Sequence, residues 1–417
     1  MKKLVLTVSA LALAICSAHA AGFGIYEASS RGNAVGGTLV GDTGDATANY
    51  YNPANIAFAT NYQVAAGVTF INPYCDVEVN HVPQGRMEPG WFTIPAFFLT
   101  VPLPFDFAFG WGNYTEYGLG SHYRQHWDLA ADTQYTTMRQ ITLNPNLAYK
   151  VCDWMSVSAG IRESWIQFEN AKQPYWGASH PLLGNYDLYS HLKGEDWAMG
   201  YNVGFDFKPT EKLSVGLVYR SQIKHKIRGD FDMTGNVGPY PVDALMPTHS
   251  HASALLKLPR SLTGGINYKV TEKFRVGTSV TWTQWKSVNT INFEIPEARS
   301  YSLPLRWKDA WRVGFGLEYD WLTWLTLRCG YTFDEDPSRK THSTSMLPCG
   351  DRHIIGAGLG FKLTDNLFLD LGYSFIRMNN EHYWITYDDT PASTDKKRYS
   401  VRNGCSHLVS ASVRYSF

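Results

Sequence analysis

The sequence predicts an all-β protein, a transmembrane antiparallel β-barrel of about fourteen strands. Three observations carry this prediction. Apolar and polar residues alternate along segments of about ten residues, short connections between such segments alternate with long ones, and the chain stops at an apolar strand that ends in Phe417. Alternation with a period of two places successive side chains on opposite faces, which is the property of a strand.

The chain begins with a segment that is typical of a secretion signal. A basic start, MKK, precedes an apolar run over residues 4–15 and a small-residue cleavage site, AHA, at 18–20. A membrane-spanning helix needs ~18 apolar residues, so this run is too short to be an anchor. Cys16 would suit a lipoprotein, but the isoleucine before it does not fit a lipobox. We therefore expect a signal peptide over residues 1–20.

The composition narrows the class of protein further. The formal net charge is +0, so no basic field favours nucleic acid. The five cysteines of the mature chain show no C-x-x-C pair and no metal-ligand spacing, and we expect neither a disulfide scaffold nor a metal or other cofactor. Aromatic residues make up 14% of the chain, and no run after residue 15 looks like a membrane helix. Such an exported chain is either a large β-sandwich or an outer-membrane barrel.

The alternation is clearest in residues 197–207, 311–319 and 367–375. In each segment one face carries large apolar and aromatic side chains, and the other carries mostly glycine, serine and isolated polar or charged residues. This asymmetry suits a wall whose apolar face meets lipid. Because backbone polar groups in lipid must all be paired, such a sheet has to close on itself.

The connections favour the barrel over the sandwich. Short links occur at 152–154, 209–212, 271–273 and 364–366, and long links near 114–138, 169–196, 233–252, 288–307, 334–351 and 377–400. Short periplasmic turns and long external loops are the pattern of an outer-membrane barrel. About seven long loops and six short turns give about fourteen strands, with both chain ends in the periplasm.

The final strand, residues 409–417, is the most specific single element. Apolar and aromatic residues alternate with serine and arginine until the chain stops at Phe417. The strand suits the edge that closes the barrel, and it resembles the C-terminal signature read by the barrel assembly machinery. The alternative is a sandwich edge strand that ends in phenylalanine by chance.

Residues 21–61 do not alternate, and they are mostly small and polar. They are too many for a simple tail before the first strand. They form either a flexible leader or a plug that folds into the barrel.

An ordered series of motifs resembles the FadL family of outer-membrane fatty-acid and hydrocarbon transporters over nearly the whole mature chain. Asn52-Pro53-Ala54 looks like the family's hatch motif, although one tripeptide is weak by itself. The series at consistent spacing is the stronger resemblance. It comprises AGF at 21–23, FGWG at 109–112, YGL at 117–119, YRS at 219–221, LP at 258–259, WKDAWR at 307–312 and YTFDEDP at 331–337.

The resemblance implies a hatch over residues 21–61 inside a barrel of residues 62–417. It implies a monomeric, non-enzymatic transporter in the outer membrane of a Gram-negative bacterium, surrounded by outer-membrane lipid and lipopolysaccharide. Its ligands would be hydrophobic small molecules, long-chain fatty acids first, with aromatic or other hydrocarbons as the alternative. The ligand would enter a groove between the third and fourth external loops, reach a lumenal pocket and leave sideways at a kinked third strand.

The kink is expected at Phe109, Gly110 and Gly112, because glycine tolerates unusual backbone angles and weakens strand pairing. Two features depart from the family pattern and leave the substrate open. The loop at 169–196 is short, and five cysteines in the mature chain are unusual.

Apolar residues of the third and fourth loops are expected to form the groove, since so many apolar side chains in an external loop are costly unless they cover something. The alternative is that the two loops pack on each other. The expected apolar ligand-binding residues are Phe23 at the mature N-terminus and, in the loops, Trp176, Leu182, Leu183, Leu188, Leu192, Tyr240, Leu245 and Met246.

A fatty-acid carboxylate also needs a cation, and arginine can hold a carboxylate through two parallel hydrogen bonds. The candidates are Arg220 and Arg312, which face inward, and Lys308 at the external start of its strand. The alternative for most inward arginines is pairing across the lumen with carboxylates. The groups in question are Arg162, Arg220, Arg275, Arg312, Arg328 and Arg414 with Asp206, Glu318 and Asp370.

Three other functions fit the sequence less well. An outer-membrane lipase needs a nucleophile and a base, and the chain has no G-x-S-x-G or H-E-x-x-H motif. A general porin constricts with charged loops and lacks an N-terminal hatch. A soluble secreted β-protein leaves the Phe417 strand unexplained.

The cysteines give one further prediction. Cys75 ends the first strand and Cys405 begins the last, and these strands are neighbours in a closed barrel. A disulfide needs a Cα separation of ~4.4–6.8 Å, which adjacent strands can provide. Cys329 is expected to point at lipid and stay free, Cys152 lies in a periplasmic turn, and Cys349 in an external loop could compete.

Overall fold

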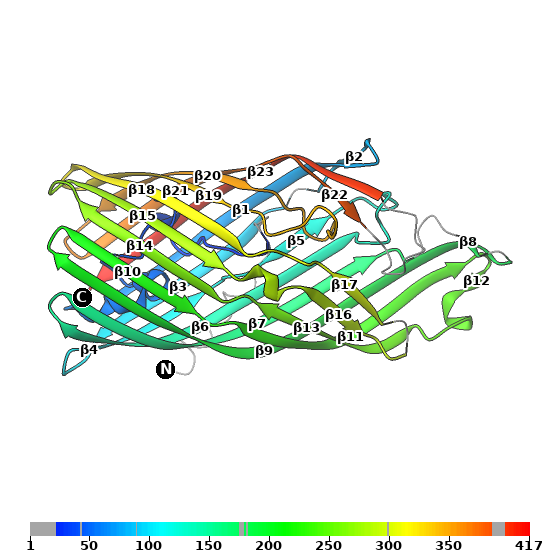
Figure 1. Ribbon diagram of the computed structural model, residues 1–417, viewed down its shortest axis with the longest axis horizontal. Coiled ribbons are helices and arrows are strands. Elements are labelled where there is room, and N and C mark those ends of the chain that lie inside the picture. Colours follow the sequence, from blue (N-terminus) through cyan, green and yellow to red (C-terminus); the bar gives the residue numbers. More distant parts are fainter. Residues whose placement is uncertain are drawn as a thin grey trace.

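The computed structural model describes residues 22–41, 44–88, 90–174, 179–180, 182–297, 300–385 and 397–417. The expected signal peptide lies outside these residues. Within them, no helix combines the length and the apolar character needed to cross a membrane. Antiparallel strands form a barrel around a folded N-terminal segment (Figure 1).

Fourteen antiparallel strands make the wall, as the alternation predicted, and the pairing of β1 with β23 from Gln63–Ser416 to Val79–Tyr399 closes it. Two of the fourteen are interrupted and carry two labels each. In order, the strands are β1 (Gln63–Val79), β3 (Phe92–Pro102), β4 (Phe107–Tyr114), β6 (Tyr135–Cys152), β7 (Met155–Lys172), β9 (Gly184–Thr210), β10 with β11 (Leu213–Arg220, Ile223–Val237), β13 with β14 (His249–Leu258, Ser261–Lys269), β15 (Phe274–Thr283), β18 (Ala310–Leu322), β19 (Leu325–Asp334), β20 (Arg352–Lys362), β21 (Leu367–Met378) and β23 (Lys397–Ser416).

Short turns join the strands at one end, where the C-terminus also lies, and longer connections join them at the other (Figure 1). This arrangement confirms the predicted alternation of turns and loops. The longer connections carry β2 (Val82–Arg86), β5 (Leu119–His122), β8 (Ser179–His180), β12 (Tyr240–Pro241), η3 (Val242–Ala244), η4 (Trp285–Ser287), β16 (Thr290–Glu294), β17 (Tyr301–Pro304) and β22 (Glu381–Ile385).

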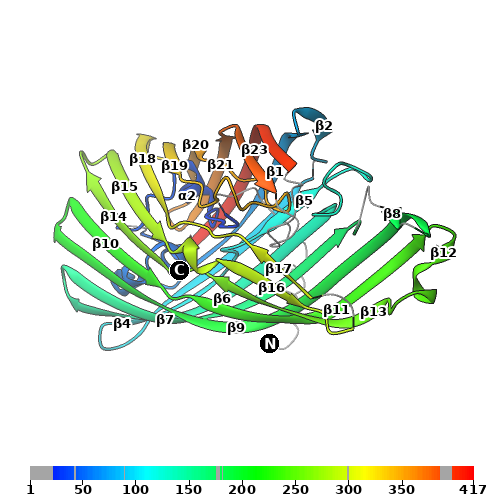
Figure 2. The same ribbon diagram turned by 45° about the vertical axis from the view of Figure 1, so that its right-hand side comes forward.

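Two segments that the sequence predicted as loops, 169–196 and 233–252, are largely strand. β9 is 27 residues long, and β11 pairs with it as far as Val237–Tyr186. The reason is that the alternation continues beyond the lipid-facing band, with Leu188 and Leu192 buried and Lys193 exposed. These extensions form an arm, residues 184–196 and 228–237, that projects beyond the rest of the barrel (Figures 1 and 2).

The N-terminal segment folds inside the barrel, so it is a plug and not a flexible leader (Figure 1). It contains α2 (Ser30–Ala34), α3 (Ala48–Tyr51) and η2 (Pro53–Phe58). The glycines on the inner face of the wall make room for it. A Cβ added at Gly314 would stand 2.5 Å from the carbonyl oxygen of Gly36, too close for any other residue.

The Asn52-Pro53-Ala54 motif is a turn tied to the barrel wall. The Asn52 side-chain oxygen accepts a hydrogen bond from the Ala54 N–H at 3.1 Å. Its amide donates to the carbonyl oxygens of Val40 at 3.0 Å and Phe205 at 2.9 Å. Pro53 begins η2, a position at which its fixed φ suits a helical turn and its missing N–H costs nothing.

The prediction of broken pairing at Phe109–Asn113 is wrong. β4 pairs without interruption with β3 from Phe97–Asn113 to Pro102–Ala108, and with β6 along its length. Gly110 instead gives room to the hatch, because a Cβ there would collide with the Asn49 side chain. Gly112 leaves space beside Tyr114 and Phe98.

The interruption lies immediately beyond this stretch, at residues 115–118. These residues leave the wall and bond to the N-terminal segment, with the Ile25 N–H donating to the Glu116 carbonyl at 2.7 Å and the Gly118 N–H to the Phe23 carbonyl at 2.9 Å. β5 then rejoins β6. The strand is therefore bent by pairing with the hatch segment, and not by the glycines before it.

The predicted Cys75–Cys405 bridge is also wrong, although β1 and β23 are neighbours. Both thiols are free. The residue opposite Cys405 is Tyr74, and the register shifts between Tyr74 and Asp76. Cys75 therefore belongs to the opposite face, where it is fully buried. Cys329 is free and exposed, as predicted.

Candidate ligand-binding site

Apolar side chains line the inner face of the arm and lead into the barrel. Near the tip, Leu183 and Leu188 pack in one cluster, and Met233 joins this cluster to the next. We call the two clusters the apolar track. Its members are Leu183, Tyr186, Leu188, Met233, Val237 and Val242, followed by Phe168, Leu192, Phe231, Ala252, Ala254, Ile291, Phe293, Ile295, Tyr301 and Leu303.

The apolar track ends at a cavity of about 50 Å³, here called the outer cavity. Phe168, Ala254 and Phe293 belong both to the track and to the lining of this cavity. The rest of the lining is apolar except for one threonine, and it consists of Phe23, Leu119, Met138, Ile227, Leu256, Ile291, Leu303, Leu305, Trp307, Thr344, Met346 and Leu347.

The structure brings together only some of the predicted groove residues. Leu183, Leu188 and Leu192 belong to the apolar track. Leu182 is exposed at the tip, where it keeps 89% of its accessible surface. Tyr240, Leu245 and Met246 are also exposed, at 49%, 44% and 39%, and Trp176 lies outside the described residues. The alternative that the loops pack on each other is therefore half right, since the inner faces pack and the tip stays open.

Phe23 closes the inner end of the outer cavity. Its ring centroid lies 4.9 Å from that of Trp285, 5.6 Å from Trp307 and 5.8 Å from Tyr117. Gly22 precedes it with φ +63°, and a Cβ there would stand 2.8 Å from the Trp285 ring, so this approach requires glycine. The next residue, Gly24, already lines a second cavity. Phe23 thus forms an aromatic partition between two chambers.

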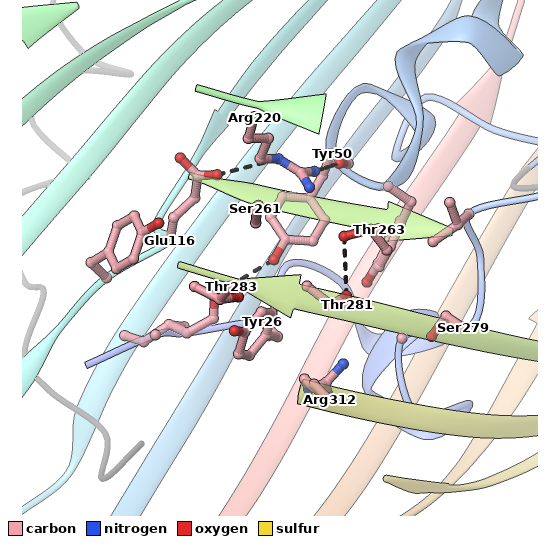
Figure 3. Close-up of a pocket in the computed structure, with 16 residues that line it drawn as sticks. Tyr26, Tyr50, Glu116, Arg220, Ser261, Thr263, Ser279, Thr281, Thr283 and Arg312 are labelled. Carbon is pink, nitrogen blue, oxygen red and sulfur yellow. Dashed lines mark hydrogen bonds and ion pairs between the residues drawn. The ribbon is translucent and has the colours of Figure 1, made fainter. Parts of the chain in front are cut away.

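The second chamber, the inner cavity, also encloses about 50 Å³ and is lined by hydroxyls, tyrosines and two arginines (Figure 3). Arg220 and Arg312, both predicted from the sequence, lie at opposite sides of it. The remaining lining is Gly24, Ile25, Tyr26, Gly37, Val40, Tyr50, Tyr51, Glu116, Tyr117, Ser261, Thr263, Ser279, Thr281 and Thr283.

The two arginines are held differently. Arg220 lies 3.4 Å from Glu116 and donates to the carbonyl oxygen of Tyr50. Arg312 stacks over the Tyr26 ring at 4.4 Å, and its nearest described carboxylate, Asp334, is 3.9 Å away. Its Nε is buried and has no hydrogen-bond partner among the described residues. A buried guanidinium N–H without an acceptor marks a place where an anion could bind.

The charges around the inner cavity do not cancel. Arg162 and Arg220 share Glu116, and Arg312 and Arg352 share Asp334. Glu27 is buried close by. Among the described residues, these four guanidinium groups pair with Glu116 and Asp334, and with Glu27 the set has four positive and three negative formal charges. We call these seven residues the inner network.

A second network at the periplasmic end joins the hatch to the wall. Arg31 of the hatch lies 2.7 Å from Glu318, and Asp45 of the hatch lies 3.0 Å from Arg414. Four arginines face four carboxylates here, and we call the set the hatch network. Its members are Arg31, Arg275, Arg328 and Arg414 with Asp45, Glu318, Asp320 and Asp370. For Arg275, Arg328 and Arg414 the predicted alternative, pairing with carboxylates, is correct.

Lys308 is not at either cavity. It forms an ion pair with Glu335 at 2.7 Å on the external side, and 43% of its side chain is exposed. Sequence reasoning missed Tyr26, Glu116 and the β16–β17 hairpin, because these residues lie in segments that do not alternate. For Tyr26, the sequence offered one signal, its place among the small and polar residues that precede the first strand. In the described part of the chain, no cluster of three or more His, Cys, Asp or Glu side chains is placed to hold a metal ion.

A plugged, lipid-facing barrel with an apolar entry and a charged inner chamber defines a transporter of the outer membrane. The comparisons with known proteins agree with this class. Residues 11–417 match the family described as outer membrane protein transport protein (OMPP1/FadL/TodX), and the chain belongs to that family. It is an outer-membrane transporter of hydrophobic compounds.

Similar proteins include outer membrane protein P1 of Haemophilus influenzae, 24% identical over 91% of this chain and 90% of that protein. The long-chain fatty acid transport protein of Escherichia coli O6:H1 is 24% identical over 90% of this chain and 92% of its own length. Among solved structures, a Pseudomonas aeruginosa FadL homologue superimposes with a TM-score of 0.84 at 20% identity, covering 95% of this chain and all of that one. The P. putida toluene transporter TodX gives a TM-score of 0.73 at 18% identity, covering 93% and 98%. The structural likenesses support the fold.

Proposed function

We propose that this protein takes up long-chain fatty acids across the outer membrane. The observation that carries the proposal is the order of two environments along one path. A cavity lined almost entirely by apolar groups lies next to a chamber with hydroxyls, two arginines and one positive charge in excess, and Phe23 lies between them. This order matches the two parts of a fatty acid, an apolar tail and one carboxylate.

The path begins at the exposed tip of the arm. Leu182, Tyr240 and Met246 offer apolar surface to a ligand in the external medium, and the apolar track leads from there to the outer cavity. Transfer along such a track avoids exposing the tail to water, which costs about 25 cal/mol per Å² of apolar surface. The track thus favours a ligand with an apolar tail, which can move along the wall without entering water.

We assign the structure to a closed state of the transport cycle. Each cavity holds about 50 Å³, less than a long-chain tail requires, so Phe23 has to move before the ligand can occupy both. Movement of residues 23–25 would also release residues 115–118, since the two segments are hydrogen-bonded to each other. The wall is interrupted at residues 115–118, and we place the sideways exit there.

The alternative ligand is a neutral aromatic hydrocarbon such as toluene, the compound for which the P. putida transporter TodX is named. Such a ligand would need the outer cavity and make no use of the excess positive charge. The test is uptake by cells that lack this gene and all its relatives, with and without the gene restored on a plasmid. We expect restored uptake of radiolabelled oleate. Restored uptake of toluene alone would make the hydrocarbon the substrate, and restoration of neither would remove the proposed function.

A further inference from the structure

The outer face of β20, β21 and β23 changes from apolar to basic at its external edge. Along each strand the outward residues are apolar or aromatic until His353, Arg377 and His407 are reached. The register places His353 opposite Arg377. His407 lies opposite Phe375, the outward residue next to Arg377 on β21. Residues opposite each other on adjacent strands have Cβ atoms about 5 Å apart. We call His353, Arg377 and His407 the basic rim.

Aromatic side chains fix both imidazoles of the rim. His353 Nδ1 lies 2.7 Å from the Tyr331 hydroxyl, and His407 Nδ1 lies 2.9 Å from the Tyr373 hydroxyl. These bonds leave the Nε2 atom of each ring for another partner. Tyrosine at this level is typical of the boundary between the hydrocarbon layer and water. The rim therefore lies at the height of the lipid headgroups.

The rim lacks a counterion among the described residues. Arg377 is exposed and forms no ion pair there. On the opposite wall, half a barrel away, outward charges of the arm are paired with one another. Beyond Trp165 and Trp197, the outward groups of β7, β9, β11 and β13 face each other with opposite charge, as in Glu169–His191 at 2.8 Å, Asp230–His251 at 3.2 Å and Asp232–His249 at 2.9 Å.

We propose that the basic rim binds phosphate groups of lipopolysaccharide in the outer leaflet. Arginine matches the geometry of phosphate oxygens, and a lipid phosphate at the headgroup level supplies the missing negative charge. This inference concerns the lipid around the barrel and does not depend on which ligand is transported.

The test compares lipid binding by the purified, folded protein. Native mass spectrometry would measure retention of lipid A with two phosphates and of the same lipid with its phosphates removed. Loss of one charged hydrogen-bonding group weakens binding about tenfold, and we expect that loss for Arg377→Gln with the phosphorylated lipid only. Arg377→Lys, which keeps the charge, should retain most of the affinity. His353→Asn with His407→Asn should weaken binding to a smaller extent.

Arg228→Gln is the matched control. Arg228 is an exposed arginine on the opposite wall, and the register places it opposite Glu195. Its replacement should leave lipid retention unchanged. Equal retention by Arg377→Gln and Arg228→Gln, or equal retention of the two lipids by the unaltered protein, would overturn the proposal. If Arg377→Gln fails to assemble, the comparison of Arg377→Lys with the histidine variants and the two lipids still decides the question.

Discussion

The two buried ion-pair networks use the same residue types but differ in charge balance. In the hatch network four arginines meet four carboxylates, and Arg31 and Asp45 of the plug take part. In the inner network four arginines meet three carboxylates, and Arg312 keeps a buried Nε without an acceptor among the described residues. Burying a charge is costly unless it is paired, so a balanced network holds structure together. A network with one arginine in excess instead attracts an anion.

Removing a partner from the hatch network should have the largest effect. Arg31→Gln leaves Glu318 and Asp45 undercompensated, and breaking a buried ion pair costs about 3 kcal/mol. The hatch should loosen, and single channels in planar bilayers should then conduct ions. The double variant Arg31→Gln with Glu318→Gln restores three arginines against three carboxylates and should conduct less than the single variant. Equal conductance of single and double variants would contradict the role of charge balance.

The hatch turn offers a comparison without charge. Asn52→Ala removes the amide that donates to the carbonyl oxygens of Val40 and Phe205, and losing these two bonds costs about 2 kcal/mol, although the Val40 oxygen keeps its bond from the Asn55 amide at 3.3 Å. Uptake should fall while the barrel still assembles. Pro53→Leu combined with Asn52→Ala should fall further. Normal uptake by the double variant in correctly folded protein would remove the hatch turn from the transport path.

Removing the excess positive charge tests the inner network. Arg312→Gln leaves three arginines against three carboxylates, so the excess positive charge disappears. The affinity for a long-chain fatty acid should fall about tenfold, the effect of losing one charged hydrogen bond. The affinity for the alcohol of equal chain length should stay within about twofold. A variant that loses both ligands equally would point to a collapsed cavity and not to a headgroup site.

The sequence predicted the wall better than the contents of the barrel. Alternation along β18 and β23 depends on neighbouring residues only, and lipid on one side makes it regular. The strand interruption at residues 115–118 depends on Phe23 and Ile25, about ninety positions earlier, and no local pattern reports it. The glycines at 110 and 112 were visible, but they accommodate Asn49, Tyr114 and Phe98.

The candidate site divides in the same way. Arg220 and Arg312 were identifiable because they interrupt the small residues of an inward face, and both line the inner cavity. Tyr26 could not be identified, because it lies in a segment without periodicity, although Arg312 stacks on its ring. The cysteine pairing failed because a register shift of one residue moves a side chain to the other face.

The smallest expected effect concerns a buried carboxylate that belongs to neither network. Asp132, in the external connection between β5 and β6, has hydrogen bonds from the Ser345 N–H at 2.6 Å and the Thr344 hydroxyl at 3.0 Å, and forms no ion pair among the described residues. Burial raises its pKa above the ordinary value, even though the hydrogen bonds act in the opposite direction. A carboxyl whose pKa is higher in the folded protein than in the unfolded chain binds its proton more tightly when folded. The contact is therefore stabilised as pH falls toward acid and weakened as pH rises through the raised pKa.

We expect slower amide hydrogen exchange of residues 344–349 at pH 5 than at pH 7, after correction for the intrinsic rates. Asp132→Asn should remove this pH dependence, and faster corrected exchange at pH 5 in the unaltered protein would contradict the assignment.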